Sequence, residues 1–293
     1  MGIRPLSIAI LFLMSACGTM KEDSSFKEEH AQWQEARIER LTSKTGWLNL
    51  AGLYWLEEGE NTIGSDSSNS IIFPANAPPR IGSLLLENGR IRFVPQKDVE
   101  VKHGNTLASE MDITTDKSGQ ATLLETGNLA WFIIERDPLF GIRLRDYEHP
   151  AIREFHGIET FPASMEWKIR AEFQAFNEPM EILIPTMIGT VEKNTCPGVL
   201  RFSINGIRQE LYPTGTGEKW FIIFADETNG VETYGGGRFL YTEKTGSGGE
   251  IIIDFNRAYN PPCAFTPFAT CPLPPRQNFL TVKIEAGEKF TGH

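Results

Sequence analysis

Side chains that could do chemistry gather in residues 254–278, a proline-rich segment late in the chain. Six of the 18 prolines of the chain lie there. Because proline fixes φ and lacks an N–H group, the segment is predicted to be an irregular loop. Long irregular loops in compact domains are often functional. This loop has a carboxylate and a guanidinium three residues apart, Asp254 and Arg257, followed by Tyr259. We therefore expect the candidate site here.

The polar groups of this loop, and of residues shortly before it, suit a small acidic or glycan-like ligand. Arginine offers a rigid fork of donors, asparagine can bind ligand hydroxyls, and tyrosine adds a flat face and a hydroxyl. The candidate ligand-binding residues are Tyr234, Arg238, Asn256, Arg257, Tyr259, Asn260 and Asn278. The alternative is that these groups only satisfy the backbone of a loop wrapped on a sheet.

A hydrolase is a second interpretation, in which two carboxylates act as general acid and base. The candidate catalytic residues are Asp226, Asp254 and Glu288. Two carboxyl groups roughly 5 to 9.5 Å apart in an open cleft would support it. Carboxylates that are all buried against arginines would instead indicate a structural envelope protein. The sequence has no serine-hydrolase or zinc-peptidase motif, so these two classes of enzyme have no support. Whether the protein is an enzyme of another class stays an open question.

Three consecutive glycines at residues 235–237 allow a close approach of the backbone to a ligand, or form a simple bulge or turn. Cys263 and Cys271 bracket a short stretch that a disulfide could close in an exported protein. Neither cysteine has a histidine or a C-x-x-C partner nearby, so we expect no metal and no cofactor.

Residues 13–17, near the start of the chain, resemble a bacterial lipoprotein signal. Residues 1–16 have a basic start at Arg4, an apolar stretch too short to span a bilayer, and small residues before a cut. The segment Leu13-Met14-Ser15-Ala16-Cys17 resembles the signal after which the cysteine is acylated. Gly18 follows, which favours the outer membrane, with the body either periplasmic or surface-exposed. The partner predicted for this end is therefore the membrane, through the lipid on Cys17.

The net charge is −10, from 28 basic and 38 acidic residues. The sequence has no cluster of lysine and arginine that could form a basic patch, and together with the negative net charge this argues against nucleic acid as a partner. Hydrophobic residues make up 40% of the chain, enough to bury a core.

The patterning predicts a mainly β protein, with two β-sandwich-like or barrel-like halves preceded by one N-terminal helix. A capping box at Ser25 to Glu28 and an apolar face predict a helix over residues 26–43. Short apolar stretches separated by turn signals predict a sandwich over residues 46–150. Eight further strands are expected in residues 151–293, the last over 279–284. The proposed segments are thus 1–16, 17–45, 46–150 and 151–293.

Two Asn-Gly pairs, Asn88-Gly89 and Asn205-Gly206, predict tight hairpin turns. Residues 59–65 and 101–105 of the first half resemble a forkhead-associated domain. The arginine with which that family binds phosphopeptides would fall at Ser65, so the resemblance implies the sandwich and not phosphothreonine binding.

The second half resembles an uncharacterised bacterial family known as domain of unknown function 1684. The stretches that carry the resemblance are residues 233–240, 254–278 and 286–289, while residues 46–64 fit the N-terminal part of the same family. The resemblance implies one family unit in which both halves cooperate, and it brings no established activity or substrate.

Overall fold

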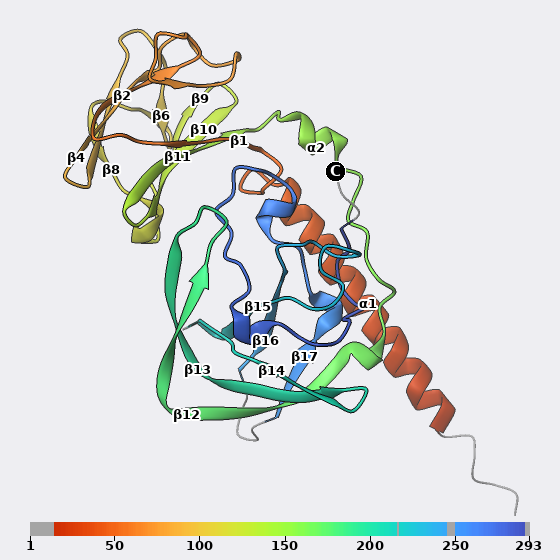
Figure 1. Cartoon of the computed structure of the whole chain (residues 1–293). Helices are drawn as coiled ribbons and strands as arrows, with labels where there is room; N and C mark the ends of the chain where they lie inside the picture. The colour runs from red at the N-terminus through yellow and green to blue at the C-terminus, as the bar shows by residue number, and fades with distance from the viewer. Residues whose placement is uncertain (1–14, 216, 245–249, 291–293) are drawn as a thin grey trace, which may run out of the picture.

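The structure is a computed structural model that describes residues 15–215, 217–244 and 250–290. It is mainly β with one long N-terminal helix, as the sequence predicts. Two β halves lie one beyond the other, and the helix runs along the second of them (Figure 1). Most of the predicted signal sequence and the side chain of Cys17 lie outside the described part. Within the described residues, no helix is long and apolar enough to cross a membrane.

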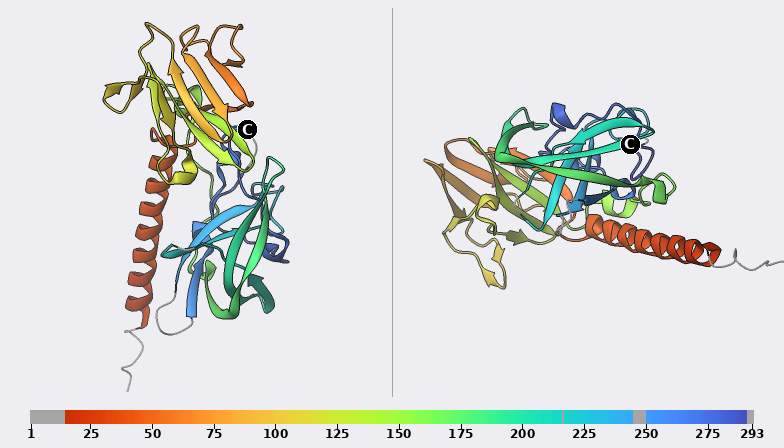
Figure 2. Two further views of the ribbon diagram at one scale, coloured as in Figure 1. Left: turned by 90° about the vertical axis from the view of Figure 1, so that its left-hand side faces the viewer. Right: turned by 90° about the horizontal axis from the view of Figure 1, so that it is seen from below.

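The helix α1 spans Ser15–Thr42 and begins earlier than the sequence predicts. No glycine or proline interrupts residues 19–25, so the helix continues through the expected capping box, whose Ser25 and Glu28 are exposed. The predicted apolar face is correct, since Phe26, Arg37 and Leu41 are buried. Both views in Figure 2 show this helix lying along the C-terminal half.

Residues 50–146 form two sheets that enclose one core. The first sheet has the order β1-β11-β10-β9-β6-β7 and the second β3-β2-β4-β5-β8. Trp131, Phe93 and Phe73 pack edge to face between them. The bounds are β1 Leu50–Trp55, β2 Gly59–Gly64, β3 Ile71–Ile72, β4 Gly82–Glu87, β5 Arg90–Pro95, β6 Lys102–His103, β7 Thr106–Leu107, β8 Met111–Ile113, η1 Asp116–Ser118, β9 Leu124–Thr126, β10 Leu129–Arg136 and β11 Leu139–Asp146.

Residues 168–254 form a four-stranded sheet, β14-β13-β12-β17, and a two-stranded ribbon, β15-β16. The hydroxyl of Thr242 on β16 donates to the carbonyl of Ile252 on β17 at 2.9 Å, so the ribbon lies beside the sheet. A short helix and a 3-10 turn precede them. The bounds are α2 Pro150–Glu154, η2 Met165–Trp167, β12 Lys168–Pro185, β13 Val191–Ile204, β14 Ile207–Leu211, β15 Lys219–Phe224, β16 Arg238–Glu243 and β17 Glu250–Asp254.

Both Asn-Gly hairpins are confirmed, since each asparagine and glycine has positive φ. They join β4 to β5 and β13 to β14. The strand prediction for the second half is wrong in two places. Two separate strands are expected over residues 165–176 and 180–184, but residues 165–167 form the 3-10 turn η2. Residues 168–185 form one continuous strand, β12, with a register irregularity between Ala175 and Met180. The strand expected over 279–284 is only a single bridge between Phe279 and Ala225.

The proline-rich loop has no strand after β17, as predicted. It forms three short 3-10 turns joined by extended stretches, and they are η3 Phe255–Arg257, η4 Pro262–Ala264 and η5 Arg276–Asn278. Phe255 and Ala258 are fully buried in the core of the second half, so the loop is wrapped onto that half as part of its wall.

The glycine triplet is a turn that leads into β16. The N–H of Gly237 donates to the carbonyl of Tyr234 at 3.1 Å. Gly237 has φ of 87°, and a Cβ there would lie 2.7 Å from the carbonyl oxygen of Phe224 and would also meet the ring of Pro274. The close approach is therefore between segments of this chain.

Replacing Gly237 by alanine is expected to lower the free energy of unfolding by roughly 1–3 kcal/mol, because the residue would be strained and in contact with backbone. Gly235→Ala is the matched control, since its Cβ would meet no atom closer than 3.7 Å and its φ is not positive. Urea denaturation of both variants measures the difference. Equal stability would contradict the close packing of this turn.

Candidate functional site

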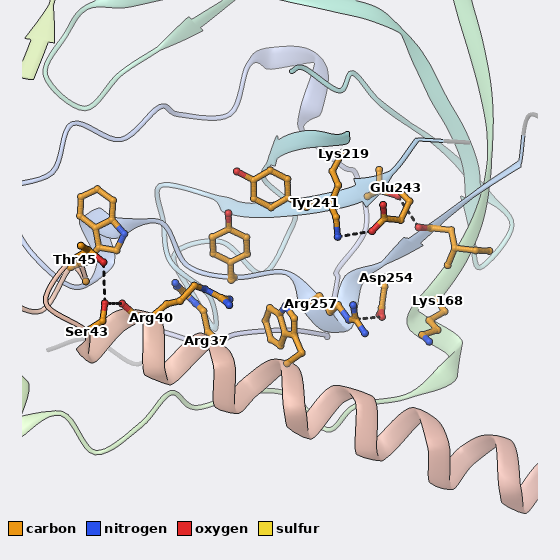
Figure 3. A pocket seen from close by; sticks show the side chains of 16 residues that line it. Arg37, Arg40, Ser43, Thr45, Lys168, Lys219, Tyr241, Glu243, Asp254 and Arg257 are labelled. Carbon is orange, nitrogen blue, oxygen red and sulfur yellow. Dashed lines mark hydrogen bonds and ion pairs between the residues drawn. The ribbon is translucent and has the colours of Figure 1, made fainter. Parts of the chain in front are cut away.

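A cavity of about 720 Å³ lies between α1 and the second half (Figure 3). Its size is within the range of small-molecule sites. The helix supplies one wall, and the ends of β15, β16 and β17 with the start of the proline-rich loop supply the other. The lining residues are Trp33, Arg37, Arg40, Ser43, Thr45, Gly46, Trp47, Lys168, Lys219, Tyr241, Thr242, Glu243, Ile252, Asp254, Arg257 and Tyr259.

Basic side chains outnumber acidic ones in this cavity, although the chain as a whole is acidic. Five side chains that line it are basic, and only Glu243 and Asp254 are acidic. Glu243 pairs with Lys219 at 2.5 Å and Asp254 with Arg257 at 3.4 Å. Among the described residues, Arg40 and Lys168 have no carboxylate within 4.0 Å. The cavity therefore has uncompensated positive charge, which favours an anionic ligand.

Aromatic rings line the middle of the cavity. Tyr241 and Tyr259 are stacked, with their centroids 6.3 Å apart and their planes at 15°. Trp33 of α1 also lines the cavity. Tyr241 is 51% exposed, so its ring is available to a ligand. Burial raises the pKa of Tyr259, so its hydroxyl stays protonated at neutral pH. Flat faces of this kind can pack against aromatic or sugar rings.

Arg37 fixes the helix wall of the cavity. Its Nε donates to Glu288 Oε1 at 2.8 Å, and its Nη2 donates to the carbonyl of Asn260 at 2.9 Å. Its guanidinium also lies over the ring of Tyr259, 4.8 Å from the centroid. Arg37 is therefore a positioning group that joins α1 to the loop and orients a tyrosine of the site.

His30 lies one turn from the cavity on the same face of α1. It is stacked between Phe26 and Trp33. Burial lowers its pKa, partly offset by the charge of Asp254. The ring therefore packs as a neutral aromatic group between its two neighbours on the helix.

Asp226 and Arg238 are not part of the cavity. Both side chains are 0% exposed, and Arg238 Nη2 donates to Asp226 Oδ2 at 2.7 Å. The arginine also donates to the carbonyls of Ile284 and Ala286. The second carboxylate oxygen accepts from Thr228. Burial lowers the pKa of Arg238, while Asp226 opposes that shift. The structure thus places these residues in a sealed ion pair outside the cavity, where their predicted ligand or catalytic roles have no support.

The three asparagines named as ligand-binding residues hold backbone instead. Asn256 bonds both the N–H and the carbonyl of Ser164. Asn278 bonds the N–H and carbonyl of Tyr212 and the carbonyl of Ile223. Asn260 donates to the carbonyl of Lys289. All three asparagines are at most 2% exposed, so the backbone interpretation is correct for them.

The three candidate carboxylates do not share one open cleft. Glu288 is 1% exposed and accepts from Arg37 and from the N–H of Asn260. Asp226 is sealed against Arg238, and only Asp254 lines the cavity. A general acid and base drawn from these three residues is therefore not supported.

Tyr234 lies in a separate shallow pocket together with Phe290, its edge-to-face neighbour, 5.1 Å away between centroids. Of the seven predicted ligand-binding residues, only Arg257 and Tyr259 line the main cavity. The residues missed are those of α1 and of the strand ends, Trp33, Arg37, Arg40, Lys168, Lys219 and Tyr241. The one available signal was Arg37, a charged side chain on the apolar face of the predicted helix.

No group of three or more metal-binding side chains occurs among the residues described. Cys263 and Cys271 face each other but are free thiols, so the predicted disulfide is not formed in this structure. Cys196 is fully buried, which raises the pKa of its thiol.

Fold and cavity together define a β protein of two halves whose N-terminal helix covers a ligand-sized, positively charged hollow. Residues 153–289 match the family described as "Protein of unknown function (DUF1684)", so the second half of the chain is similar to that family. This confirms the resemblance drawn from the C-terminal motifs. Residues 46–64, expected to fit the same family, lie outside the match.

One similar solved structure is the solution NMR structure of an uncharacterized protein of Haloarcula marismortui. It is 27% identical, with a TM-score of 0.40, over 48% of this chain and 80% of that one. No curated protein matches the chain. The forkhead-associated-like interpretation of the first half is not confirmed.

Replacing Asp226 by asparagine is expected to lower the free energy of unfolding by roughly 3–5 kcal/mol, because Arg238 would keep its charge with no buried counter-ion. Glu232→Gln removes a carboxylate from the exposed pair with Lys283, 3.8 Å long, and should cost less than about 1 kcal/mol. Guanidinium denaturation compares the two. A small effect of Asp226→Asn would show that this pair is not sealed in solution.

Proposed function

We propose that the second half, closed by α1, binds a small anionic ligand that has a ring. The observation that carries this proposal is the excess of basic side chains in an aromatic-lined cavity of an otherwise acidic chain. Anions near such a cavity gain from its positive field, and carboxylates match the donor fork of an arginine. An acidic sugar and an aromatic acid both meet these requirements.

In this proposal the two parts of the ligand contact different walls. The acidic group of the ligand lies near Lys168 and Arg257. Lys168 has no carboxylate partner among the described residues. Arg257 is 38% exposed at its side chain and shares its charge with Asp254 over 3.4 Å, so it can turn toward a ligand. The ring packs against Tyr241 and Tyr259 in the part of the cavity that Trp33 also lines.

The paired state of both carboxylates in the cavity gives hydrolysis no support, so a binding protein is preferred to a hydrolase. Glu243 pairs with Lys219 and Asp254 pairs with Arg257, so neither is an unpartnered carboxylate facing the cavity. The sealed ion pair and the asparagines contribute to the fold that positions the cavity.

Galacturonate and galactose test the ligand class, because they differ by a carboxylate. We expect galacturonate to raise the melting temperature and to show heat in titration calorimetry, and galactose to bind at least tenfold more weakly. 4-Hydroxybenzoate with phenol provides the same comparison for an aromatic acid. Binding should weaken as salt rises, since exposed charges are screened. Equal binding of acid and neutral analogue in both pairs would contradict an anion site.

Lys168→Gln and Arg257→Gln are each expected to weaken binding of the acid that responds by roughly 5- to 20-fold, which corresponds to about 1–2 kcal/mol for one charge-assisted contact. Lys193→Gln is the control, because Lys193 is an exposed lysine of β13 outside the cavity that pairs with Glu181. Titration calorimetry at fixed ionic strength measures all three. Unchanged affinity in both cavity variants would remove the site from this position.

We further propose that the protein is an envelope lipoprotein anchored through Cys17 in the outer membrane. The apolar stretch in residues 1–16 and the residues that precede Cys17 support it. Replacing Cys17 by serine should release the chain from the membrane fraction and abolish incorporation of labelled palmitate. A Cys196→Ser chain is the control and should stay in the membrane fraction. Membrane retention of the Cys17 variant would contradict the anchor.

A further inference from the structure

Two free thiols face each other where residues 263–271 close on themselves. The N–H of Cys263 donates to Cys271 Sγ at 3.0 Å, and the N–H of Cys271 donates to Cys263 Sγ at 3.4 Å. These reciprocal bonds direct both sulfurs into the space between the two backbones. Cys263 is half-buried and Cys271 is buried, so only the first is accessible to a reagent.

A buried arginine with no counter-ion lies at the same place. Arg143 of β11 is 5% exposed, its Nε has no hydrogen-bond partner, and its Nη2 reaches only the hydroxyl of Thr270, at 3.4 Å. Its guanidinium lies 5.5 Å from the ring of Trp47, which packs in the same hydrophobic cluster as Cys263 and Cys271. Among described residues it has no carboxylate within 4.0 Å. Burial and the charge of Arg136 lower its pKa to about 10, so it is charged at neutral pH.

The two thiols differ in acidity as well as in exposure. A hydrogen bond from Cys271 lowers the pKa of Cys263, with help from the N–H of Cys271 and the charge of Arg143. The pKa of Cys271 is raised, because its thiol donates that hydrogen bond and is more buried. A half-buried thiol of lowered pKa beside a buried thiol is the arrangement of an attacking and a resolving cysteine.

We propose that Cys263 and Cys271 form a redox-active dithiol site, held beside the guanidinium of Arg143, that exchanges with low-molecular-weight or protein disulfides. The Cys263 thiolate attacks one sulfur of the external disulfide and releases one thiol. The Cys271 sulfur, after losing its proton to solvent, attacks Cys263 Sγ in the mixed disulfide and releases the second thiol. The chain loses two hydrogens, and the external disulfide is reduced to two thiols.

The position of the pair gives the reaction a structural effect. Thr270 accepts from both Arg136 and Arg143 of the first half. The carbonyl of Cys271 accepts from the N–H of Met187 at the tip of the β12–β13 hairpin. Oxidation thus closes a covalent loop where both halves of the molecule meet.

The test uses oxidised glutathione and the full chain with Cys17→Ser, read by intact mass and peptide mapping. We expect loss of two hydrogens, a disulfide between Cys263 and Cys271, and a free Cys196 as the internal control. Cys271→Ser should keep a glutathione adduct on Cys263, whereas Cys263→Ser should give none on Cys271. Thiols that stay reduced, or an adduct that forms first on Cys271, would overturn the proposal.

The role of the guanidinium is tested in the Cys271→Ser background by the rate of adduct formation. Arg143→Gln is expected to slow it roughly three- to tenfold, because the thiolate fraction falls. Arg143→Lys should restore most of the rate. Arg136→Gln is the matched control, since it removes a charge that also contacts Thr270 but pairs with Asp116. An equal loss in the Arg143→Gln and Arg136→Gln variants would show a merely structural role for Arg143. If Arg143→Gln does not fold, the adduct rates of Arg143→Lys and Arg136→Gln are compared instead. A rate for Arg143→Lys as low as that of a chain without the Cys263 thiol would overturn the proposed role of the guanidinium.

Discussion

The ion pair between Arg37 and Glu288 joins the first helix of the molecule to its last segment, and the cavity depends on it. Glu288 is almost fully buried, and a buried carboxylate needs a cation and further hydrogen bonds to offset its lost hydration. Arg37 provides the cation only when α1 lies against the loop. The same guanidinium covers Tyr259, so helix docking and orientation of the site are one event.

Two ion pairs of the same residue types have different roles because one is buried and the other is partly exposed. Asp226 with Arg238 and Asp254 with Arg257 are both aspartate–arginine pairs in the second half. The first is closed off by the core and bonded to backbone carbonyls, and because both side chains are fully buried a ligand cannot reach them. The second lies at the edge of β17, with its arginine more than a third exposed. Only a group that can exchange its partner for a ligand without leaving a buried charge can bind reversibly.

The local patterns of the sequence predicted the β architecture well because they depend on near neighbours. Both Asn-Gly turns, the apolar face of α1 and the irregular character of the proline-rich loop follow from properties of a few adjacent residues. The site was harder to predict because it is assembled from α1, β12, β15, β16 and β17, which only tertiary packing brings together. Lys168 and Lys219 are the first residues of β12 and β15, and in the sequence they cannot be told from ordinary surface lysines. They become part of the site only because α1 forms the other wall of the cavity.

The polar motif residues misled for a related reason. An arginine or asparagine in a sequence offers the same donors whether they face a ligand or a carbonyl. The amides of Asn256, Asn260 and Asn278 bond backbone groups of the segments that the proline-rich wall covers. A proline-rich wall has few N–H groups of its own with which to do so. The residue types were informative, but their direction depends on which segments pack over them.

The length of α1 also sets a distance. Twenty residues separate Cys17 from Arg37 within one uninterrupted helix, which at about 1.5 Å per residue is roughly 30 Å. With an acyl chain on that cysteine, the helix would act as a stiff spacer whose upper part is also a wall of the binding cavity. The height at which the protein meets its ligand above the lipid surface would then be fixed by helix geometry, whereas a flexible tether would leave it free to vary.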